Sequence, residues 1–420
     1  MFRAFKWLYP GMRVKRWIAV IFLGVFLSNF GSFALMMAFL TTEPASANRW
    51  YWLAALFYVL GGIPLLTGVY RLMKSLGDLL ELRGRQKGLV DIAFERRYLG
   101  LGPRVVALGG GTGMATLLEG LKEYTSQVAA VVSVADDGGS SGRLRRELDM
   151  LPPGDIRKCM VALSDEAPLL GDLMSYRFKD SELAGHSFGN LFLTVLWELT
   201  GDFGEAVRQA GRILSIRGRV IPATLDRISL VAKHEDGSTT IGQRDISESG
   251  KRISSIELRP KPGPASGDIV GAIAEADMVI IGPGSLYTSV LPNLLIEGVA
   301  EAIRGSEALK VYVANIASDE GETAGFSLRD HLDAVARHTG TLPFDVVLAN
   351  SPAAAPAVVR SFRESGAKPV TYDPREFEGN GFPVRFVEAD VGSHESPVRH
   401  DPGKLARSLM ALLAEERDRA

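Results

Sequence analysis

The sequence predicts an α/β protein with a mainly parallel sheet, preceded by two transmembrane helices. Two segments near the N-terminus, 17–40 and 50–70, contain no charged residue. In the remainder of the 420-residue chain, short apolar runs alternate with segments of helical length, which is typical of a parallel sheet covered on both faces. Several of these runs end in glycine-rich loops, as the strands of phosphate-binding α/β units do.

The two uncharged segments are long enough to cross a membrane. At about 1.5 Å per helical residue, each exceeds the roughly 30 Å hydrocarbon core of a bilayer. Basic residues precede the first segment and follow the second, whereas the connection holds only Glu43 and Arg49 as charged residues. The positive-inside rule therefore places both ends of this pair in the cytoplasm, and we expect a multi-pass protein of the cell membrane.

A secretory signal peptide is the alternative interpretation of the first segment. Residues 45–47 read Ala-Ser-Ala, which resembles a cleavage site. The apolar run is much longer than that of an ordinary signal peptide. The second segment would in any case return the chain to the cytoplasm. The predicted organisation is a transmembrane hairpin over 1–75, an amphipathic juxtamembrane linker over 76–103, and one large cytoplasmic domain over 104–420.

Charge and cysteine content exclude some functions. The net charge of −2 gives no overall attraction for a polyanion, so we expect no binding to nucleic acid. Cys159 is the single cysteine, which excludes an internal disulfide and fits a reducing compartment. No histidine adjoins Cys159 in sequence, and we interpret it as a small buried apolar residue.

The large domain is expected to contain one principal sheet and a small insertion. Apolar runs predict strands at 105–108, 128–134, 278–281, 310–314, 344–348 and 369–372. Helices are predicted at 269–276, 329–338 and 357–364. An antiparallel insertion is predicted from 227–233, 239–242 and 253–258, with a turn at Asp236-Gly237. Asp401 is expected to cap a final helix that begins at Pro402.

The first glycine loop follows the first strand and departs from two common nucleotide motifs. A P-loop would need lysine at position 114, which is Met114 here, and that position also fails to supply the third glycine of a dinucleotide fingerprint. Hydrolysis of ATP and binding of NAD are therefore disfavoured, and we expect no cofactor. A tight turn without a ligand is the alternative, but we expect a phosphate or pyrophosphate to bind the backbone of Gly109, Gly110, Gly111, Thr112 and Gly113.

Asp136 and Asp137 end the second strand, close to the expected phosphate site. Carboxylates repel phosphate, so these two either bind hydroxyl groups of ribose or sugar, or hold a divalent cation that bridges to phosphate. We also expect one of them to cap the following turn. The next loop offers further amides and an arginine for anion binding, at Gly139, Ser140, Ser141 and Arg143.

A third loop follows the strand at 278–281 and repeats the composition of the first. Gly284 allows close approach of the backbone, Ser285 supplies a hydroxyl, and Tyr287 either stacks on a base or sugar or belongs to the core. His186 lies in a helix-entry loop without the spacing of a catalytic triad or a zinc site, so we expect it to be structural.

Five ordered motifs within about 104–413 resemble the YvcK family of gluconeogenesis factors (UPF0052), which is part of the CofD-like superfamily. They are the glycine loop at 109–113, residues 135–145, Pro-Pro-Gly-Asp-Ile-Arg at 152–157, Gly-His-Ser with Gly189-Asn190, and residues 282–289. Departures from the family pattern are Lys158, where asparagine is usual, and residues 317–320.

The resemblance implies a Rossmann-like three-layer domain that binds a UDP-sugar such as UDP-N-acetylglucosamine or UDP-glucose. It also implies a role in growth and cell shape on gluconeogenic carbon sources, through the supply of cell-wall precursors, and places Asn190 among the ligand-binding residues. It implies no established reaction. It leaves open a homo-oligomer and contact with cell-wall synthesis enzymes.

Two functions of different classes follow. The first is a membrane-tethered UDP-sugar sensor, since the phosphate loops lack an evident base, nucleophile or lysine. The second is a CofD-like transferase of a phospho-acyl group, in which Asp136 or Asp137 holds Mg²⁺ against the diphosphate of a nucleotide-activated donor. Whether the protein is an enzyme therefore depends on which function applies.

Overall fold

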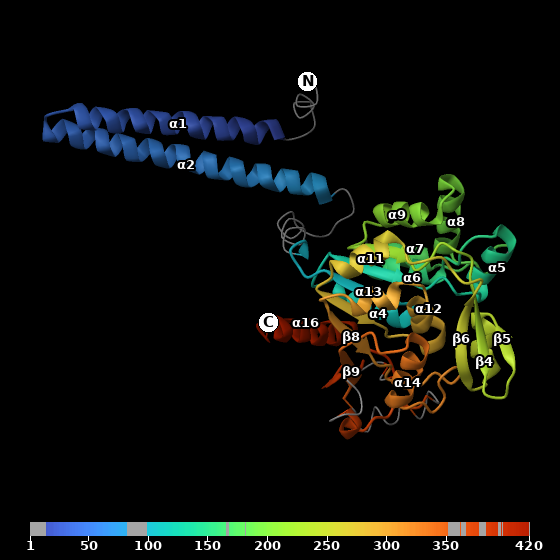
Figure 1. Ribbon diagram of the computed structural model, residues 1–420. Coiled ribbons are helices and arrows are strands. Elements are labelled where there is room, and N and C mark those ends of the chain that lie inside the picture. Colours follow the sequence, from blue (N-terminus) through green and yellow to red (C-terminus); the bar gives the residue numbers. More distant parts are fainter. Residues whose placement is uncertain are drawn as a thin grey trace. The chain divides into compact units, whose positions relative to one another are not determined.

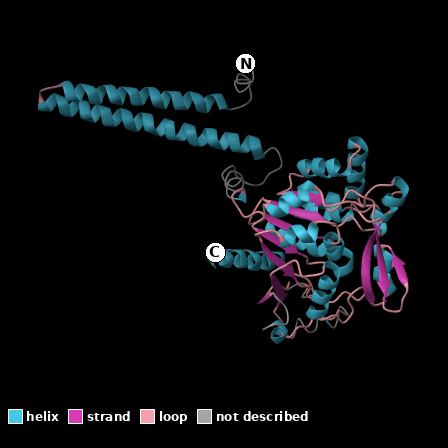
Figure 2. Cartoon of the chain, viewed as in Figure 1, coloured by secondary structure: helices cyan, strands magenta, loops and turns pink. Residues whose placement is uncertain are grey.

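The computed structural model describes residues 14–81, 99–164, 168–180, 182–351, 362, 367–377, 384–393, 396 and 398–419 (Figures 1 and 2). The chain divides into two compact units, Met1–Phe94 and Glu95–Ala420. The first is the N-terminal helical hairpin and the second is the α/β domain.

The N-terminal unit consists of two long helices, α1 (Val14–Leu40) and α2 (Pro44–Glu81). Both are long and apolar enough to cross a membrane, over Arg16–Leu40 and Pro44–Lys74. The helix α2 continues past the second predicted span, so the start of the expected juxtamembrane helix is continuous with that span. Residues 82–98 of the expected linker lie outside the described residues.

Small residues bring the two helices of the hairpin together. A Cβ atom added to Gly24 would lie 2.8 Å from the carbonyl oxygen of Gly61, and one added to Gly61 would lie 2.7 Å from that of Gly24. Such close backbone contact is typical of helix pairs in membranes. Phe22 and Phe39 point outward and are 69% and 75% exposed, which an apolar solvent would favour.

The large unit is built on a seven-stranded sheet with the order β10-β9-β8-β7-β1-β2-β3, in which every recorded pairing is parallel. The strands are β1 (Val105–Gly109), β2 (Val128–Val132), β3 (Arg219–Pro222), β7 (Met278–Ile281), β8 (Leu309–Val313), β9 (Val346–Asn350) and β10 (Arg385–Ala389). The central strands β1, β2 and β7 are buried at every position, as continuous apolar runs require in a sheet covered on both faces.

Helices cover the two faces of this sheet and complete the predicted three-layer α/β fold (Figure 1). Those before β3 are α4 (Gly111–Leu121), α5 (Gly139–Leu148), α6 (Gly154–Leu163), α7 (Pro168–Ser175), α8 (Phe188–Thr200) and α9 (Phe203–Ile213). They are followed by α11 (Gly267–Ala274), η2 (Leu286–Val290), α12 (Leu291–Leu294), α13 (Val299–Arg304), α14 (Leu328–Thr339), η3 (Pro374–Phe377) and α16 (Pro402–Arg419).

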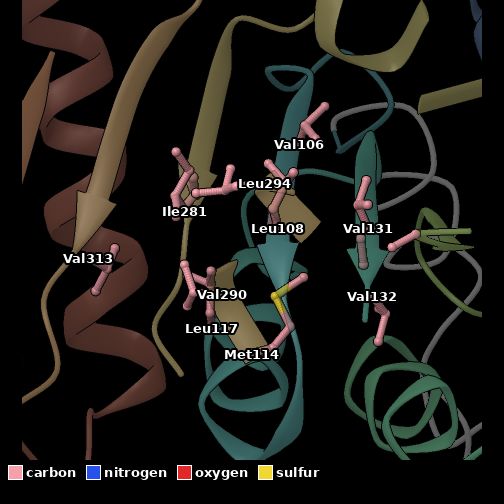
Figure 3. Close-up of a cluster of buried hydrophobic side chains, with 14 of the residues drawn as sticks. Val106, Leu108, Met114, Leu117, Val131, Val132, Ile281, Val290, Leu294 and Val313 are labelled. Carbon is pink, nitrogen blue, oxygen red and sulfur yellow. The ribbon is translucent and has the colours of Figure 1, made fainter. Parts of the chain in front are cut away.

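The core fills the space between sheet and helices. Figure 3 shows Leu108 of β1 and Ile281 of β7 beside Met114 and Leu117 of α4. These four side chains are at most 1% exposed. The apolar spacing in α4 thus fixes the helix against β1 immediately after the glycine loop, and this packing holds the loop in place.

The antiparallel insertion is confirmed as a separate three-stranded sheet with the order β5-β4-β6. Its elements are β4 (Ser229–His234), β5 (Thr239–Ile241), α10 (Gln243–Ser249) and β6 (Ile253–Arg259). Gly237 in the expected turn has a φ of 82°, a left-handed conformation that favours glycine.

The edges of the main sheet were predicted least well. The strands β3 and β10 were missed, and the segment 369–372 forms only an isolated bridge between Ala317 and Pro369. The strand β10 is only partly buried, so it lacks the continuous apolar run that marks a central strand. The helix expected at 357–364 falls almost entirely outside the described residues.

Candidate functional site

The order of strands creates a switch point between β1 and β7. From β1 the chain proceeds to β2 and β3 on one side, and from β7 it proceeds to β8, β9 and β10 on the other. In open α/β sheets the crevice outside the carboxyl ends of strands at such a point is where ligands bind. The two strands pair directly, with Leu108 opposite Ile281, and each continues into a glycine loop.

The two glycine loops are in close contact. A Cβ atom on Gly113 would lie 2.7 Å from the carbonyl oxygen of Pro283, and one on Gly284 would lie 3.4 Å from that of Gly110. No side chain fits at position 113 without moving the opposite loop. The predicted residues of the first and third loops are thus brought together at the switch point, with the exception of Tyr287.

A cavity of about 440 Å³ opens beside these loops, within the usual range for small-molecule sites. Helix α4 contributes Thr112, Gly113 and Thr116 from its first two turns, where backbone amides lack intrahelical partners at the start of a helix. The remaining lining comes from the loops after β7 and β8 and from the segment before α16: Pro283, Gly284, Ser285, Asn315, Ile316, Ala317, Ser318, Asp319, Val398, Arg399 and His400.

Hydrogen bonds hold the β7 loop to the β8 loop. Asn315 accepts a bond from the amide of Gly284 at 3.1 Å and donates its own side-chain amide to the Gly284 carbonyl at 2.9 Å. Ser285 donates its hydroxyl to Asp319 at 3.0 Å. The segment 317–319, which departs from the family pattern, therefore takes part in shaping the cavity wall.

Arg399 and His400 were not predicted as site residues. Arg399 is exposed and forms no ion pair with any described residue. His400 is buried, and this burial lowers its pKa to about 4; its Nε2 has no hydrogen-bond partner in the part of the chain that the structure describes. Asp401 accepts the Lys404 amide at 2.8 Å and caps the last helix, as predicted. The position of Arg399 and His400 directly before this cap was the only feature of the sequence that could have indicated them as site residues.

The two aspartates after β2 have separate roles. Asp137 accepts the amides of Gln243 and Arg244 at 3.1 and 2.9 Å and so caps α10 of the insertion. The expectation that Asp137 faces a sugar or a cation is thereby corrected, because backbone groups occupy both of its oxygens. The predicted cap of the following turn is confirmed for Asp136, which accepts the Gly138 amide at 3.0 Å, whereas the helix that Asp137 caps is distant in sequence.

Asp136 lies beside a carboxylate that was not predicted, that of Asp155. It accepts the Gly138 amide at 3.0 Å. Burial, followed by the charge of Asp155, raises the pKa of Asp136. Asp155 accepts the amide of Gly111 at 2.8 Å and the ammonium of Lys158 at 2.9 Å. The pair of carboxylates near the phosphate loop therefore consists of Asp136 and Asp155.

Several other predicted ligand residues form a buried polar network. Ser140 lies 3.0 Å from Nδ1 of His186 and accepts the side-chain amide of Asn190 at 3.1 Å. Asn190 in turn accepts Nε of Arg157 at 3.1 Å. All four are buried, and they join α5, α6 and α8. His186, Ser140 and Asn190 therefore share one network that joins these helices, and the ligand-binding role of Ser140 and Asn190 stays a prediction.

Arg143, Gly139 and Ser141 lie in the same region and do not line the cavity. Arg143 donates to the carbonyl of Ala184 at 2.7 Å. Gly139 has a φ of 48°, and nothing lies within 4 Å of a Cβ built there. A hydrogen bond from Ser141 lowers the pKa of Asp136, opposing the effect of burial, so Ser141 supports that carboxylate.

Tyr287 is a core residue, which is the second of the two roles predicted for it. The side chain is fully buried, and its hydroxyl donates to the carbonyl of Ile253 at 3.4 Å. Its ring meets those of Phe326 and His338 edge to face, with centroids 6.3 and 6.1 Å apart. Because the ring packs against these two side chains, it belongs to the core and does not line the cavity.

Glu322 is a buried carboxylate that the sequence did not single out. It accepts the amides of Tyr287 and Thr288 at 3.2 Å each, the hydroxyl of Thr288, and the hydroxyl of Ser247 at 3.0 Å. Burial raises the pKa of Glu322 to about 7. The residue connects α10 of the insertion to the loop after β7.

Comparison with known families agrees with this architecture. The family described as 2-phospho-L-lactate transferase CofD matches residues 105–390, which include both glycine loops and the Asp136 and Asp155 pair. This chain belongs to the CofD family. The resemblance to gluconeogenesis factors is likewise confirmed by relatives that share about two fifths of their residues with it.

Relatives of this CofD-family chain cover either its whole length or the large domain. A protein of Clostridium acetobutylicum is 40% identical over 424 residues, covering 98% of this chain and 92% of that one. The Gluconeogenesis factor of Bacillus subtilis is 42% identical over 319 residues, covering 76% of this chain and 100% of that one. The crystal structure of a UPF0052 family member from Bacillus halodurans superposes with a TM-score of 0.70 at 40% identity, covering 74% of this chain and 99% of that one.

Burial perturbs the thiol and one imidazole in the described part of this CofD-family chain. Burial raises the pKa of Cys159, the only thiol, which therefore stays protonated. Burial, followed by the charge of Arg143, lowers the pKa of His186. Among the described residues, no three histidine, cysteine or acidic side chains gather as a metal site. The arrangement is best suited to binding an anion through backbone amides, hydroxyls and Arg399.

Proposed function

We propose that this protein is a UDP-sugar-binding regulatory factor of the cytoplasm, anchored by its N-terminal hairpin in the cell membrane. The observation that carries the proposal is the 440 Å³ cavity at the switch point of the sheet, between two backbone-rich loops. A pyrophosphate is the ligand group that such a cavity suits best, because helix starts and glycine loops present several amides toward an anion.

The other groups around the cavity suit the remaining parts of a nucleotide sugar. Arg399 offers a phosphate a guanidinium that forms no ion pair with the described residues. Thr112 and Ser285 add hydroxyl groups, and Asn315 and Ser318 offer donors and acceptors for sugar or base. UDP-N-acetylglucosamine and UDP-glucose are the ligands that we propose.

A regulatory rather than catalytic role is supported by the chemistry of the cavity. Its one histidine, His400, has a pKa lowered to about 4 by burial and is a weak base. Asp319 is engaged by Ser285 and by the amide of Gly321 at 3.0 Å. No described lining residue is a cysteine or lysine. We infer that the protein senses precursor supply and adjusts flux toward the cell wall during gluconeogenic growth.

Anchoring in the membrane rests on the two long apolar helices and their flanking charges. The window with highest hydropathy in each helix is only 17% buried within the structure, so most of this apolar surface needs another apolar environment. By the positive-inside rule, the basic flanks support a cytoplasmic location of the large domain.

Isothermal titration calorimetry with the full chain in detergent micelles tests this proposal. We expect UDP-N-acetylglucosamine or UDP-glucose to bind in the presence of a chelator, with GDP and NAD as comparison ligands that bind much more weakly. Absence of any binding by UDP-sugars would refute the proposal. Preferential binding of a guanine nucleotide would favour a transferase instead.

A CofD-like transferase is the second candidate, because the family that matches residues 105–390 is described by that activity. It requires a nucleotide-activated phospho-acyl donor and Mg²⁺ near the diphosphate. With Asp137 engaged by α10, Asp136 and Asp155 would have to hold the ion. Turnover of such a donor that stops on addition of a chelator would support this candidate over the first.

A further inference from the structure

The paired carboxylates Asp136 and Asp155 pose an electrostatic problem for an anion site. Asp155 is tied directly to the phosphate loop through the Gly111 amide at 2.8 Å, and its side chain is only 9% exposed. Asp136 is close enough that the charge of Asp155 raises its pKa. Two negative charges beside the loop oppose the binding of a diphosphate unless a positive charge compensates them.

Lys158 supplies such a charge from within the chain. It lies one turn after Asp155 on α6, and its ammonium is 2.9 Å from Oδ1 of Asp155. The same ammonium lowers the pKa of Asp136. Oδ2 of Asp136 lies 2.8 Å from a Cβ built on Gly154, the residue before Asp155. The side chain of Lys158 is 38% exposed. Through Asp155 it is joined to Gly111, the residue before Thr112 of the cavity lining.

Lys158 and backbone amides already use these oxygens, so we expect no divalent cation there while the lysine is present. Mg²⁺ requires near-octahedral coordination by oxygen at about 2.1 Å. Oδ1 of Asp155 contacts the ammonium and Oδ2 accepts the Gly111 amide. Asp136 accepts the Gly138 amide, and both oxygens of Asp137 cap α10. The described residues offer no further acidic or imidazole ligand to complete a cluster.

We propose that the ammonium of Lys158, bound to Asp155 beside the phosphate loop, takes the place of a divalent cation there, so that this protein binds the diphosphate of its ligand without metal. Only the identity of the ligand rests on the proposed function. An ordinary surface ion pair is a different arrangement, because its carboxylate is solvated and touches nothing else. Here the carboxylate is buried and holds an amide of the phosphate loop.

Binding of Mn²⁺ to the full chain in detergent micelles tests the proposal without any nucleotide. Electron paramagnetic resonance measures the free Mn²⁺ that remains during a titration. We expect no saturable site in the wild type up to about 1 mM, a range in which weak carboxylate sites bind. Lys158→Ala should gain one site, and Lys158→Gln provides a second neutral variant. Adding Asp155→Asn to Lys158→Ala should remove the gained site.

Lys261→Ala is the matched control, because Lys261 is an exposed lysine of the same domain that pairs with Glu297 and not with a carboxylate of the phosphate loop. It should bind Mn²⁺ no better than the wild type does. A wild-type site as tight as that of Lys158→Ala would overturn the proposal. Folded Lys158→Ala and Lys158→Gln proteins without any Mn²⁺ site would overturn it as well.

Ligand binding gives an independent second result. UDP-N-acetylglucosamine should bind the wild type equally with chelator and with Mn²⁺, whereas Lys158→Ala should lose at least about tenfold in affinity with chelator and regain it with Mn²⁺. An equal loss in both conditions would contradict the proposal and assign Lys158 a direct contact with the ligand. If no UDP-sugar binds even the wild type, the proposed function fails, while the Mn²⁺ titration still decides the role of Lys158.

Discussion

The amide of Gly111 donates a hydrogen bond to Asp155 at 2.8 Å and thereby joins the loop after β1 to the start of α6. The sequence separates these residues by 44 positions, yet both belong to the crevice at the switch point. The first amide of α4 is thus used by a carboxylate of the protein. A ligand phosphate must therefore use the following amides and the hydroxyl of Thr112.

Replacement of Gly111 by valine should abolish binding of UDP-sugars. The φ of Gly111 is +68°, so any side chain costs about 1–2 kcal/mol of stability, and a valine side chain would extend into the space of the phosphate. Gly201→Val is a matched control, since Gly201 has a φ of +69° at the end of α8 and nothing within 4 Å of its Cβ position. Calorimetry should show lost binding for Gly111→Val and intact binding for Gly201→Val. Equal affinity of the two variants would show that the first loop is only a turn.

Asparagine at position 136 and asparagine at position 137 should have different effects. Asp137→Asn weakens the cap of α10, and we expect a loss of about 0.5–2 kcal/mol in the free energy of unfolding with little change in affinity. Asp136→Asn relieves repulsion from Asp155 and should leave stability unchanged or raised while altering affinity. Urea unfolding and calorimetry on both variants separate these outcomes. A large affinity loss in Asp137→Asn at unchanged stability would contradict the structural role of Asp137.

Arg399→Gln should weaken binding of UDP-sugars. Loss of a hydrogen bond to a charged group costs about 1.5–3 kcal/mol, equivalent to roughly tenfold to a hundredfold in dissociation constant. Arg375→Gln serves as the control, because Arg375 is an exposed arginine paired with Asp373 outside the cavity. Affinities are compared by calorimetry at fixed ionic strength. Identical affinities for the two variants would remove Arg399 from the site.

His400 should make the protein less stable in acid. Its pKa is lowered to about 4 by burial, from an ordinary value of 6.5. Between these values the unfolded chain binds a proton at this residue that the folded chain does not, so stability falls as pH decreases from 6.5 to 4. The loss from this residue amounts to at most about 3 kcal/mol. Chemical unfolding of wild type and His400→Asn across this range should show a smaller decline in the variant, whereas parallel curves would contradict the prediction.

The orientation of the hairpin is testable with introduced thiols. Cys159 is completely buried, so the native chain gives a low background of labelling. Thr42→Cys lies in the exposed connection between α1 and α2, and Ser254→Cys lies on an exposed position of β6. An impermeant maleimide should label Thr42→Cys in intact cells and label Ser254→Cys only after lysis. The reverse pattern would place the large domain outside the cytoplasm.

The central strands and the glycine loops were predictable because burial on both faces imposes an unbroken apolar run. The strands β1 and β7 carry that signal, and the loops after them are read from local glycine content. Edge strands carry a weaker sequence signal, since the residues of β10 are only partly buried. The insertion was predictable from its turn, where Asp236 accepts the Ser238 amide at 2.8 Å.

The roles of individual polar side chains were less accessible to sequence reasoning. Asp137 and Asp136 are adjacent in sequence, but alternate orientation sends one toward α10 and the other toward Asp155. Partners that lie about a hundred residues apart, such as Asp137 and Gln243, leave no local pattern. Arg399 lines the cavity because the segment between β10 and α16 passes beside the loops after β7 and β8. Such contacts follow from the folded topology and not from spacing along the chain.

Hydrogen bonds join α10 of the antiparallel insertion to both halves of the main sheet. Asp137 makes them on the side of β2, and Glu322 makes them on the side of β7 and β8. We infer that these contacts of the insertion hold the crevice at the switch point at a constant width. The entropy of ordering the crevice is lost when the protein folds and not when a ligand arrives. Association should accordingly proceed in one kinetic phase limited by encounter, without the slower closing step that hinged two-lobed binding proteins require.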